Sequence, residues 1–236
     1  MSSDSRRLGI SLAWPITIPI FAGFIFLGMA FGLYATGLGL PWYLPILMSS
    51  TIFAGSMEFL TATLLFSPFD PLGALLLTLV VNARHFFYGL SLLEAYRGTG
   101  WKKFFLIFGL CDETFAVNVT ADVPEEANKG WFYLTVTTLD YCYWVGGVAL
   151  GSIAGGFINF SLKGIEFTLV ALFAVLFLET LLTAKQKHFG SSGVVVSGIM
   201  LAIFGPKVFM IPAIIGVLAV CIALRKTERL DLEEVA

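Results

Sequence analysis

The chain has 236 residues, of which 58% are hydrophobic and only 13% are charged. A soluble domain carries about 25% charged residues, so this composition excludes a soluble domain. Its 14 Lys and Arg against 16 Asp and Glu give a formal net charge of -2, which offers no basic surface for nucleic acid. A membrane-spanning helix needs about 20 apolar residues, which leaves room for about eight spans. We therefore predict a polytopic integral membrane protein with one transmembrane domain over residues 1–236 and no nucleic-acid partner.

The N-terminal segment begins with Arg6 and Arg7, and its apolar run continues from Leu8 to Tyr34. This run is longer than the apolar core of a cleavable signal peptide, which has about 7 to 15 residues. By the positive-inside rule, the two arginines predict that the N-terminus lies in the cytoplasm.

Breaks at Gly, Pro and charged residues divide the chain into apolar segments. Strand-like alternation is absent from them, and runs this long are unlike the weak pattern of a membrane β-barrel. The fold class is therefore predicted to be all-α, with about seven to eight hydrophobic helical segments. They lie near 8–36, 42–66, 71–96, 104–121, 130–160, 165–184, 193–204 and 208–224. The last two, which are split by Gly205, Pro206 and Lys207, indicate a helical hairpin or two thin, tilted spans.

Basic residues cluster at four places, and the positive-inside rule expects all four in the cytoplasm. The clusters are Arg6/Arg7, Arg97/Lys102/Lys103, Lys185/Lys187 and Arg225/Lys226/Arg229. Three apolar segments separate the first cluster from the second, and three more separate the second from the third. One segment in each interval is therefore expected to enter and leave by the same face, or to cross twice. The glycine-containing segments 42–66 and 130–160 are the candidates, and such paired interruptions are typical of transporters built from a repeat.

Three small residues, Ala54, Gly55 and Ser56, interrupt the segment 42–66, and Glu58 follows them. Small residues let helices pack closely, which is one interpretation. The functional interpretation is an unwound turn whose free N–H groups, at the start of the next helix, hold an anionic group. On that interpretation Gly55 and Ser56 bind a carboxylate of the substrate, and Glu58 binds its ammonium.

The stretch Asn82-Ala83-Arg84-His85-Phe86-Phe87-Tyr88-Gly89 carries polar side chains around most of a helix circumference. A single lipid-facing helix cannot hide all of them, so a deep cavity or a break in the helix is expected. Arg84, deep in an apolar segment, is suited to a bidentate contact with a carboxylate. We predict Asn82, Arg84 and His85 as substrate-binding residues. The alternative for His85 is a structural hydrogen bond between helices.

Acidic residues outnumber Arg84 inside the apolar segments. They are Glu58, Asp112, Glu113, Asp140 and Glu179. An ionisable residue near the bilayer centre costs about 2.5 to 3.5 kcal/mol, so such residues usually face a cavity or each other. Because full ionisation would bury a large negative charge, some of them should be protonated, as proton coupling requires. We predict Asp112, Glu113 and Asp140 as coupling residues. The alternative for Glu113 and Glu179 is a hydrated helix end at the level of the lipid headgroups.

A combination of stretches, in this order and spacing, resembles a known family. The stretches are Ala54-Gly55-Ser56-Met57-Glu58, Asn82 to Gly89, Asp112-Glu113-Thr114-Phe115-Ala116 and Asp140-Tyr141-Cys142-Tyr143-Trp144-Val145-Gly146-Gly147. They resemble the AzlC family, the large subunit of branched-chain amino acid exporters. The resemblance implies export of hydrophobic amino acids across the bacterial inner membrane, together with a separately encoded small membrane subunit of the AzlD type. Glu58 departs from the family's pattern, in which glutamine is expected, and this difference bears on ion coupling and on the charge preference for the substrate.

The resemblance thus indicates a secondary transporter for branched-chain or other hydrophobic amino acids, driven by an ion gradient, and not an enzyme. We expect Phe115, with Phe86 and Phe87, to line an apolar pocket for the substrate side chain. The sequence has two histidines and no His-Glu-x-x-His helix, so no metal is expected. No cofactor is expected either. Membrane lipid is the other predicted partner.

Two other classes stay open on the sequence alone. Ser56 and His85 could form the nucleophile and base of an intramembrane serine-type hydrolase. The sequence around Ser56 lacks the second glycine of a Gly-x-Ser-Gly loop, which disfavours this class. A passive channel is the other alternative, and it differs from a transporter in being unable to concentrate a labelled substrate transiently by counterflow.

Overall fold

The computed structural model describes residues 3–157 and 187–205, together with residues 174, 178, 209, 212–213, 215–217, 219–220 and 222–223. These residues form helices and connecting turns, with no β-strand among them, so the all-α prediction is confirmed. The chain divides into two compact units, Met1–Thr168 and Leu169–Ala236, and each is described by itself. Glu179 and nearly all of the predicted segment 165–184 lie outside the described residues.

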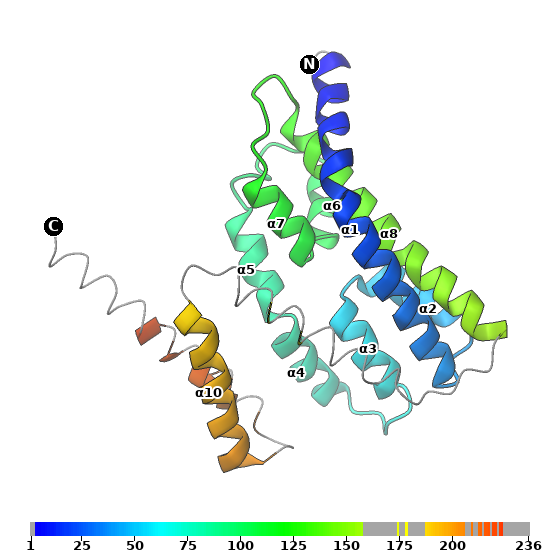
Figure 1. Ribbon diagram of the computed structural model, residues 1–236, viewed down its shortest axis with the longest axis vertical. Helices are drawn as coiled ribbons and strands as arrows, with labels where there is room; N and C mark the ends of the chain where they lie inside the picture. The colour runs from blue at the N-terminus through cyan, green and yellow to red at the C-terminus, as the bar shows by residue number, and fades with distance from the viewer. Residues whose placement is uncertain are drawn as a thin grey trace, which may run out of the picture. The chain divides into compact units, whose positions relative to one another are not determined.

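The helices of the first unit correspond to the first five predicted segments, and three of these segments are each split into two helices (Figure 1). The helices are α1 (Ser3–Gly37), α2 (Tyr43–Ile52), α3 (Gly55–Leu64), α4 (Pro71–Val81), α5 (Ala83–Ser91), α6 (Lys102–Phe108), α7 (Asp112–Thr120) and α8 (Lys129–Phe157). In the second unit, α10 (Lys187–Phe204) ends at Gly205, whose φ is +71°. Gly216, among the helical residues that follow, packs against Val196 and Met200 of α10, so residues of the predicted segments 193–204 and 208–224 lie against each other.

The two longest helices, α1 and α8, pack side by side along their length and form the scaffold of the first unit (Figure 1). Glycines on both helices allow this close approach. A Cβ added at Gly28 of α1 would lie 2.8 Å from the Trp144 carbonyl oxygen, and one at Gly147 of α8 would lie 2.7 Å from the Ile25 carbonyl oxygen. Because small residues let two helix backbones come this near, the pair is held mainly by van der Waals contact.

The prediction that segment 130–160 is discontinuous is wrong. Its glycines lie within one uninterrupted helix, α8, and two of them, Gly147 and Gly151, face the backbone of α1. They therefore serve helix packing and do not break the helix. The interrupted segment in this part of the chain is 104–121, which forms α6 and α7.

The segment 42–66 is interrupted as predicted, at Phe53 and Ala54 between α2 and α3. Phe53 has a φ of +45°, in the left-handed region that non-glycine residues rarely adopt. The turn lies against the middle of α8, where a Cβ at Gly55 would lie 2.9 Å from the Trp144 ring. The chain therefore reverses direction halfway along the α8 scaffold.

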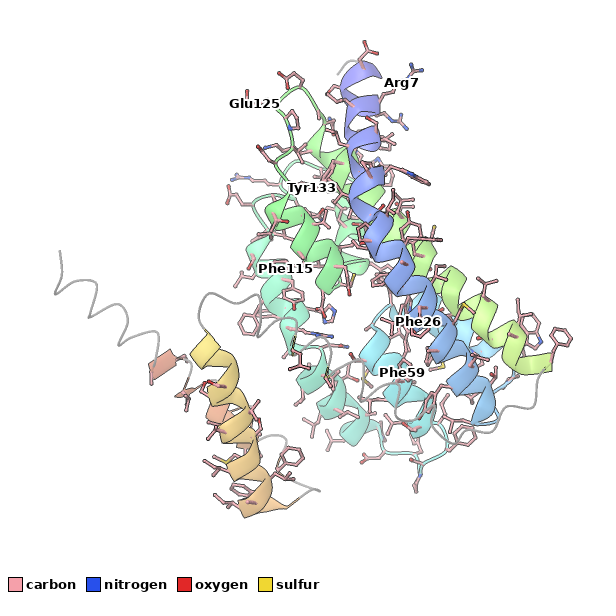
Figure 2. All side chains as sticks on the ribbon, in the orientation of Figure 1. Arg7, Phe26, Phe59, Phe115, Glu125 and Tyr133 are labelled. Carbon is pink, nitrogen blue, oxygen red and sulfur yellow. The ribbon has the colours of Figure 1, made fainter. Side chains whose placement is uncertain are left out.

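Both outer ends of the α2–α3 hairpin lie toward the C-terminal end of α1. Trp42, just before α2, lies near Gly156 at the end of α8. After the break, α3 runs back beside α1, where Figure 2 labels Phe59. The Phe59 ring lies 5.0 Å from that of Phe31 and 5.3 Å from that of Tyr34. The hairpin thus enters and leaves at one end of the unit.

The α6–α7 hairpin enters from the opposite end. Lys102, at the start of α6, lies over the ring of Trp131 near the start of α8, and the Asn128 N–H donates to the Ser5 carbonyl at 3.0 Å. The chain breaks at residues 109–111, where Gly109 contacts the methyl group of Thr137. The two hairpins therefore approach the middle of α8 from opposite ends.

Aromatic side chains join the two breaks. The rings of Phe53 and Phe108 are stacked with 6.3 Å between centroids, and Tyr141 of α8 contacts both, at 5.2 and 6.1 Å. The Tyr141 hydroxyl also donates to the Ser50 carbonyl at 2.9 Å. The midpoint of α8 is thus where two interrupted segments, far apart in sequence, meet.

By length and composition, one helix in the described residues, α1, could cross a membrane. The pair α4 and α5, bent by 46°, is a second if it counts as one span. The segments 42–66 and 104–121 are divided into shorter helices, whereas α8 is continuous over 29 residues. Large apolar side chains such as Phe26, Leu79 and Phe104 lie exposed on these helices, as expected for a surface that meets lipid.

Candidate functional site

The breaks bring the first turns of three helices together. Arg84 lies in the first turn of α5, and its Nη1 forms an ion pair with Asp112 Oδ2, at the start of α7, at 2.7 Å. Arg84 Nη2 donates to the hydroxyl of Ser56, in the first turn of α3, at 3.4 Å. Three stretches that are separate in the sequence thereby converge on one guanidinium.

Asn82 positions this guanidinium. It ends α4 and precedes α5, and the 46° bend between the two helices falls at this residue. The break in the segment that the polar stretch predicted is therefore present. The bend turns the start of α5, and with it Arg84, toward Ser56 and Asp112.

Arg84 and Asp112 differ in how well their charges suit the N-terminus of a helix. The N-terminus of a helix carries a partial positive charge, which favours an anion and disfavours a cation. Asp112 in the first turn of α7 is therefore favourably placed, whereas Arg84 in the first turn of α5 is not. An anion beside Arg84 offsets this cost, and in this conformation the Asp112 carboxylate fills that position.

The ion pair is accessible, and the polar groups near it retain hydrogen-bonding capacity. The side chains of Arg84 and Asp112 are 39% and 33% exposed. Buried polar atoms that make no hydrogen bond within the described part of the protein are found on both of these residues and on two neighbours of Arg84. They are Asn82 Oδ1, Arg84 Nε, His85 Nδ1 and Asp112 Oδ1. Buried polar atoms are normally satisfied, so these four atoms have hydrogen-bonding capacity that the described residues do not use.

Glu58, two residues after Ser56 in the first turn of α3, is fully buried. Its Oε1 accepts a hydrogen bond from the Ala54 N–H at 3.0 Å, and the Trp144 indole N–H lies 3.0 Å from both carboxylate oxygens. The carboxylate therefore fastens the turn between α2 and α3 to α8. In this conformation its hydrogen bonds position Gly55 and Ser56.

Asp140 is also fully buried on α8, and neither carboxylate oxygen makes a hydrogen bond among the described residues. Thr137, one turn earlier, contacts Gly109 at one break, and Trp144, one turn later, contacts Gly55 at the other. Asp140 is thus situated between the two breaks. Glu113, in the first turn of α7, is the charged residue that interacts with it electrostatically.

Aromatic rings cover one side of the Arg84 region. Phe115 of α7 stacks on Tyr88 of α5 with 4.3 Å between centroids, and His85 meets the edge of Tyr88 at 5.8 Å. Phe86 and Phe87 contact each other and are 72% and 57% exposed. The structure therefore places Phe115 near the candidate site and places Phe86 and Phe87 on the outer surface of α5 in this unit.

Sequence reasoning missed Trp144, Tyr88 and Tyr141 as parts of this arrangement. A signal for Trp144 was available, because an indole N–H in an apolar segment needs an acceptor. Tyr88 shares a helix face with Arg84, four residues earlier. No sequence pattern identifies Tyr141, because its ring contacts depend on where two distant breaks meet.

Broken helices whose first turns face a charged, partly accessible centre, in a chain this apolar, define a membrane transport protein. The AzlC protein family model matches residues 19–158, a range that contains every predicted site residue. The chain belongs to the AzlC family.

Several curated relatives are similar over most of their length. A Bacillus subtilis protein named branched-chain amino acid transport protein AzlC is 50% identical over 214 residues, which are 91% of this chain and 84% of the relative. A membrane protein of Haemophilus influenzae is 42% identical over 86% of this chain and 84% of its own. The inner membrane protein YgaZ of Escherichia coli is 29% identical over 87% of this chain and 84% of its own. No solved structure matches.

Proposed function

We propose that the chain is a secondary transporter that exports branched-chain or other hydrophobic amino acids across the bacterial inner membrane, driven by an ion gradient. The single observation that carries this proposal is the partly exposed Arg84–Asp112 ion pair at the meeting point of three helix starts. The name of the Bacillus subtilis relative supports the choice of branched-chain substrates.

An amino acid zwitterion matches the two halves of this ion pair. Its carboxylate can take the place of Asp112 on the Arg84 guanidinium, and its ammonium can then pair with the released Asp112. The net charge of the site is unchanged by this insertion, so no uncompensated charge is buried. The hydroxyl of Ser56 and the N–H groups of the first turn of α3 are beside the position of the carboxylate.

The proposed role of Glu58 is to hold the turn at Gly55 and Ser56. Direct contact between Glu58 and the ammonium requires the hydrogen bonds from Ala54 and Trp144 to open first. Asp112 is the carboxylate that an ammonium reaches without breaking this arrangement, since it is 33% exposed. Asn82 and His85 supply further polar atoms, and Phe115 with Tyr88 contacts the apolar side chain.

Asp112, Glu113 and Asp140 are the proposed coupling residues. A carboxylate without hydrogen bonds is costly to bury in ionised form, which favours a protonated Asp140. When substrate binds, Asp112 exchanges the Arg84 guanidinium for the substrate ammonium. This change of partner alters the proton affinity of its carboxylate in each transport cycle. Proton movement between Asp112 and Asp140 would pass by Glu113, which interacts with Asp140.

The proposed orientation places the N-terminus in the cytoplasm. Arg6 and Lys102, from two clusters assigned to that side, both lie over the ring of Trp131 and so lie at one end of the unit. With this orientation, α6–α7 is a re-entrant hairpin from the cytoplasmic side and α2–α3 one from the opposite side. Residues 1–236 form one transporter domain that works with a small AzlD-type subunit in a lipid bilayer.

Transport is favoured over hydrolysis because Ser56 pairs with Arg84, and no hydrogen bond joins Ser56 to His85 in the described residues. The decisive test is counterflow in proteoliposomes that contain the chain and its small membrane subunit. Vesicles preloaded with unlabelled leucine should accumulate labelled leucine transiently above equilibrium. A channel would let the label equilibrate without an overshoot, and that result would contradict the proposal.

A further inference from the structure

A second site lies at the opposite end of the first unit from the α2–α3 hairpin. It is a cavity of about 410 Å³ beside the starts of α1, α6 and α8. Figure 2 shows Arg7 and Glu125 at this end of the unit. The lining residues come from α1, from the loops before α6 and α8, and from the first residues of those helices. They include Ser5, Arg97, Thr99, Lys102, Glu125 and Lys129.

Trp131 organises the basic residues near this cavity. The Arg6 guanidinium lies 3.7 Å from the centroid of its ring and the Lys102 ammonium lies 4.4 Å from it. Two cations that would otherwise repel each other are thus held near one another by attraction to the same indole ring. An anion between or beside them would reduce their remaining repulsion.

Lys102 is the observation that indicates a ligand. Only 9% of this residue is exposed, and it lines the cavity, yet its ammonium forms no ion pair or hydrogen bond with the described residues. The side chain is thus mostly buried while its ammonium, which lines the cavity, has no carboxylate or other acceptor to balance its charge. The indole compensates for part of this cost, but it leaves the N–H donors of the ammonium without an oxygen acceptor.

The charge balance of the cavity favours an anion. Arg97, Lys102 and Lys129 face a single acid, Glu125. The carboxylate nearest to Arg97 is that of Glu94, at 3.7 Å, and both of these side chains are largely exposed, so this pair is weak. At Gly130 a Cβ would lie 3.7 Å from Lys102 Nζ, and the lack of a side chain there keeps the space next to the ammonium free.

We infer that this cavity binds a phosphate group through Lys102, with Arg97 and Lys129 at its rim. Lysine is a common point-charge ligand of phosphate. Two sources share this chemistry, an anionic phospholipid headgroup and a soluble phosphate ester. The phospholipid fits the setting, because basic pockets between helices at the cytoplasmic surface are places where anionic headgroups bind.

Binding there would tie together the start of α6, the loop before α8 and the N-terminal turn of α1. The α6–α7 hairpin carries Asp112 at its inner end, so its outer end needs a fixed anchor. The ligand is therefore expected to raise the thermal stability of the purified protein whether or not substrate is present. Because thermal stability is measured without transport, a negative result would contradict the phosphate site without contradicting the proposed transport function.

The test measures the melting temperature and native mass spectrum of the full chain in detergent, with phosphatidylglycerol or phosphatidylcholine added. The site predicts a higher melting temperature and bound lipid with phosphatidylglycerol alone. The variant Lys102→Gln should weaken phosphatidylglycerol binding by about tenfold or more, which corresponds to about 1.4 kcal/mol. Lys102→Arg should retain binding. The matched control is Lys103→Gln, which removes the neighbouring charge of the same cluster from outside the cavity and should bind as the wild type does.

Glycerol phosphate separates the two sources. If it displaces phosphatidylglycerol, the headgroup phosphate occupies the cavity. If it binds in a Lys102-dependent way while phosphatidylglycerol does not, the source is soluble and the phosphate site still stands. The inference is overturned if, in the wild-type protein, the two lipids change the melting temperature equally and glycerol phosphate has no effect. This outcome does not depend on any variant. Undiminished binding of both ligands by folded Lys102→Gln would overturn it as well.

Discussion

Both carboxylate oxygens of Glu58 lie 3.0 Å from the indole nitrogen of Trp144, and this contact joins the turn between α2 and α3 to the middle of α8. The two residues are 86 positions apart in the sequence. Neither is exposed beyond 6%. The contact therefore holds the first turn of α3, and with it Ser56, in place beside Arg84.

Trp144→Phe should destabilise the protein by about 1 to 3 kcal/mol, because it removes the indole donor from a buried carboxylate. Glu58→Gln in the Trp144→Phe background should recover part of this loss, since an amide is less costly to bury than an ionised acid. Unfolding in detergent, followed for the single and double variants, measures both effects. Trp14→Phe, at a tryptophan that is 58% exposed, is the control. Equal stability of Trp144→Phe and wild type would contradict the anchoring role.

Gly147→Ala should lower stability by about 1 to 3 kcal/mol, because the added methyl group has no room against the backbone of α1. A Cβ at this position would lie 2.7 Å from the Ile25 carbonyl oxygen. The adjacent variant Gly146→Ala is a matched control, because a Cβ there meets nothing within 4 Å. Thermal unfolding of the two purified variants tests the difference. If both behave alike, the close packing of α1 and α8 is not what these glycines provide.

Phe115→Ala should reduce the preference of the protein for leucine over alanine. An apolar pocket contributes about 0.8 kcal/mol for each buried CH₂ group, so the wild-type protein should bind leucine several-fold more tightly than alanine. Loss of the ring stacked on Tyr88 removes part of that pocket. Competition binding with both amino acids gives the ratio, and Phe86→Ala, at a residue that is 72% exposed, should leave it unchanged. A wild-type protein with equal affinity for leucine and alanine would rule out the pocket.

Asp112→Asn should separate exchange from gradient-driven export. The amide keeps the shape of the side chain but cannot carry a proton, and it forms a weaker contact with Arg84. Leucine exchange across proteoliposome membranes should persist, with weaker affinity for leucine because the amide no longer offers a charge to the ammonium, while export should lose its dependence on an imposed proton gradient. If export by this variant still responds fully to the proton gradient, Asp112 is not a coupling residue.

Part of this arrangement could be predicted from the sequence because the signals are local. Ala54, Gly55 and Ser56 next to an acid predicted an interruption, and the structure has one beginning one residue earlier, at Phe53. The polar stretch that begins at Asn82 predicted a break, and a 46° bend falls there. Small or polar residues in an apolar run favour a break or bend of the helix at that point, so such interruptions can be recognised without a structure.

Other features could not be predicted because they depend on which helices meet. The glycines of α8 resemble those of a broken helix, but they contact α1 and leave α8 continuous. The break at residues 109–111 has one glycine and no proline, so the sequence gives little warning of it. Local sequence patterns likewise could not show that Asp112 pairs with Arg84, a contact of 2.7 Å in the structure.

The central claim is that the carboxylate of the substrate takes the place of Asp112 on Arg84. Leucinamide tests it directly, because it keeps the ammonium and side chain of leucine but has no carboxylate. Competition against labelled leucine should show that the wild-type protein binds leucine at least about tenfold more tightly than leucinamide, a difference of about 1.4 kcal/mol. Arg84→Lys should lose much of this preference because it lacks the planar fork, whereas Arg7→Lys, at an exposed arginine outside both sites, should keep it. Equal competition by leucine and leucinamide in the wild-type protein, or an unchanged preference in Arg84→Lys, would contradict the account.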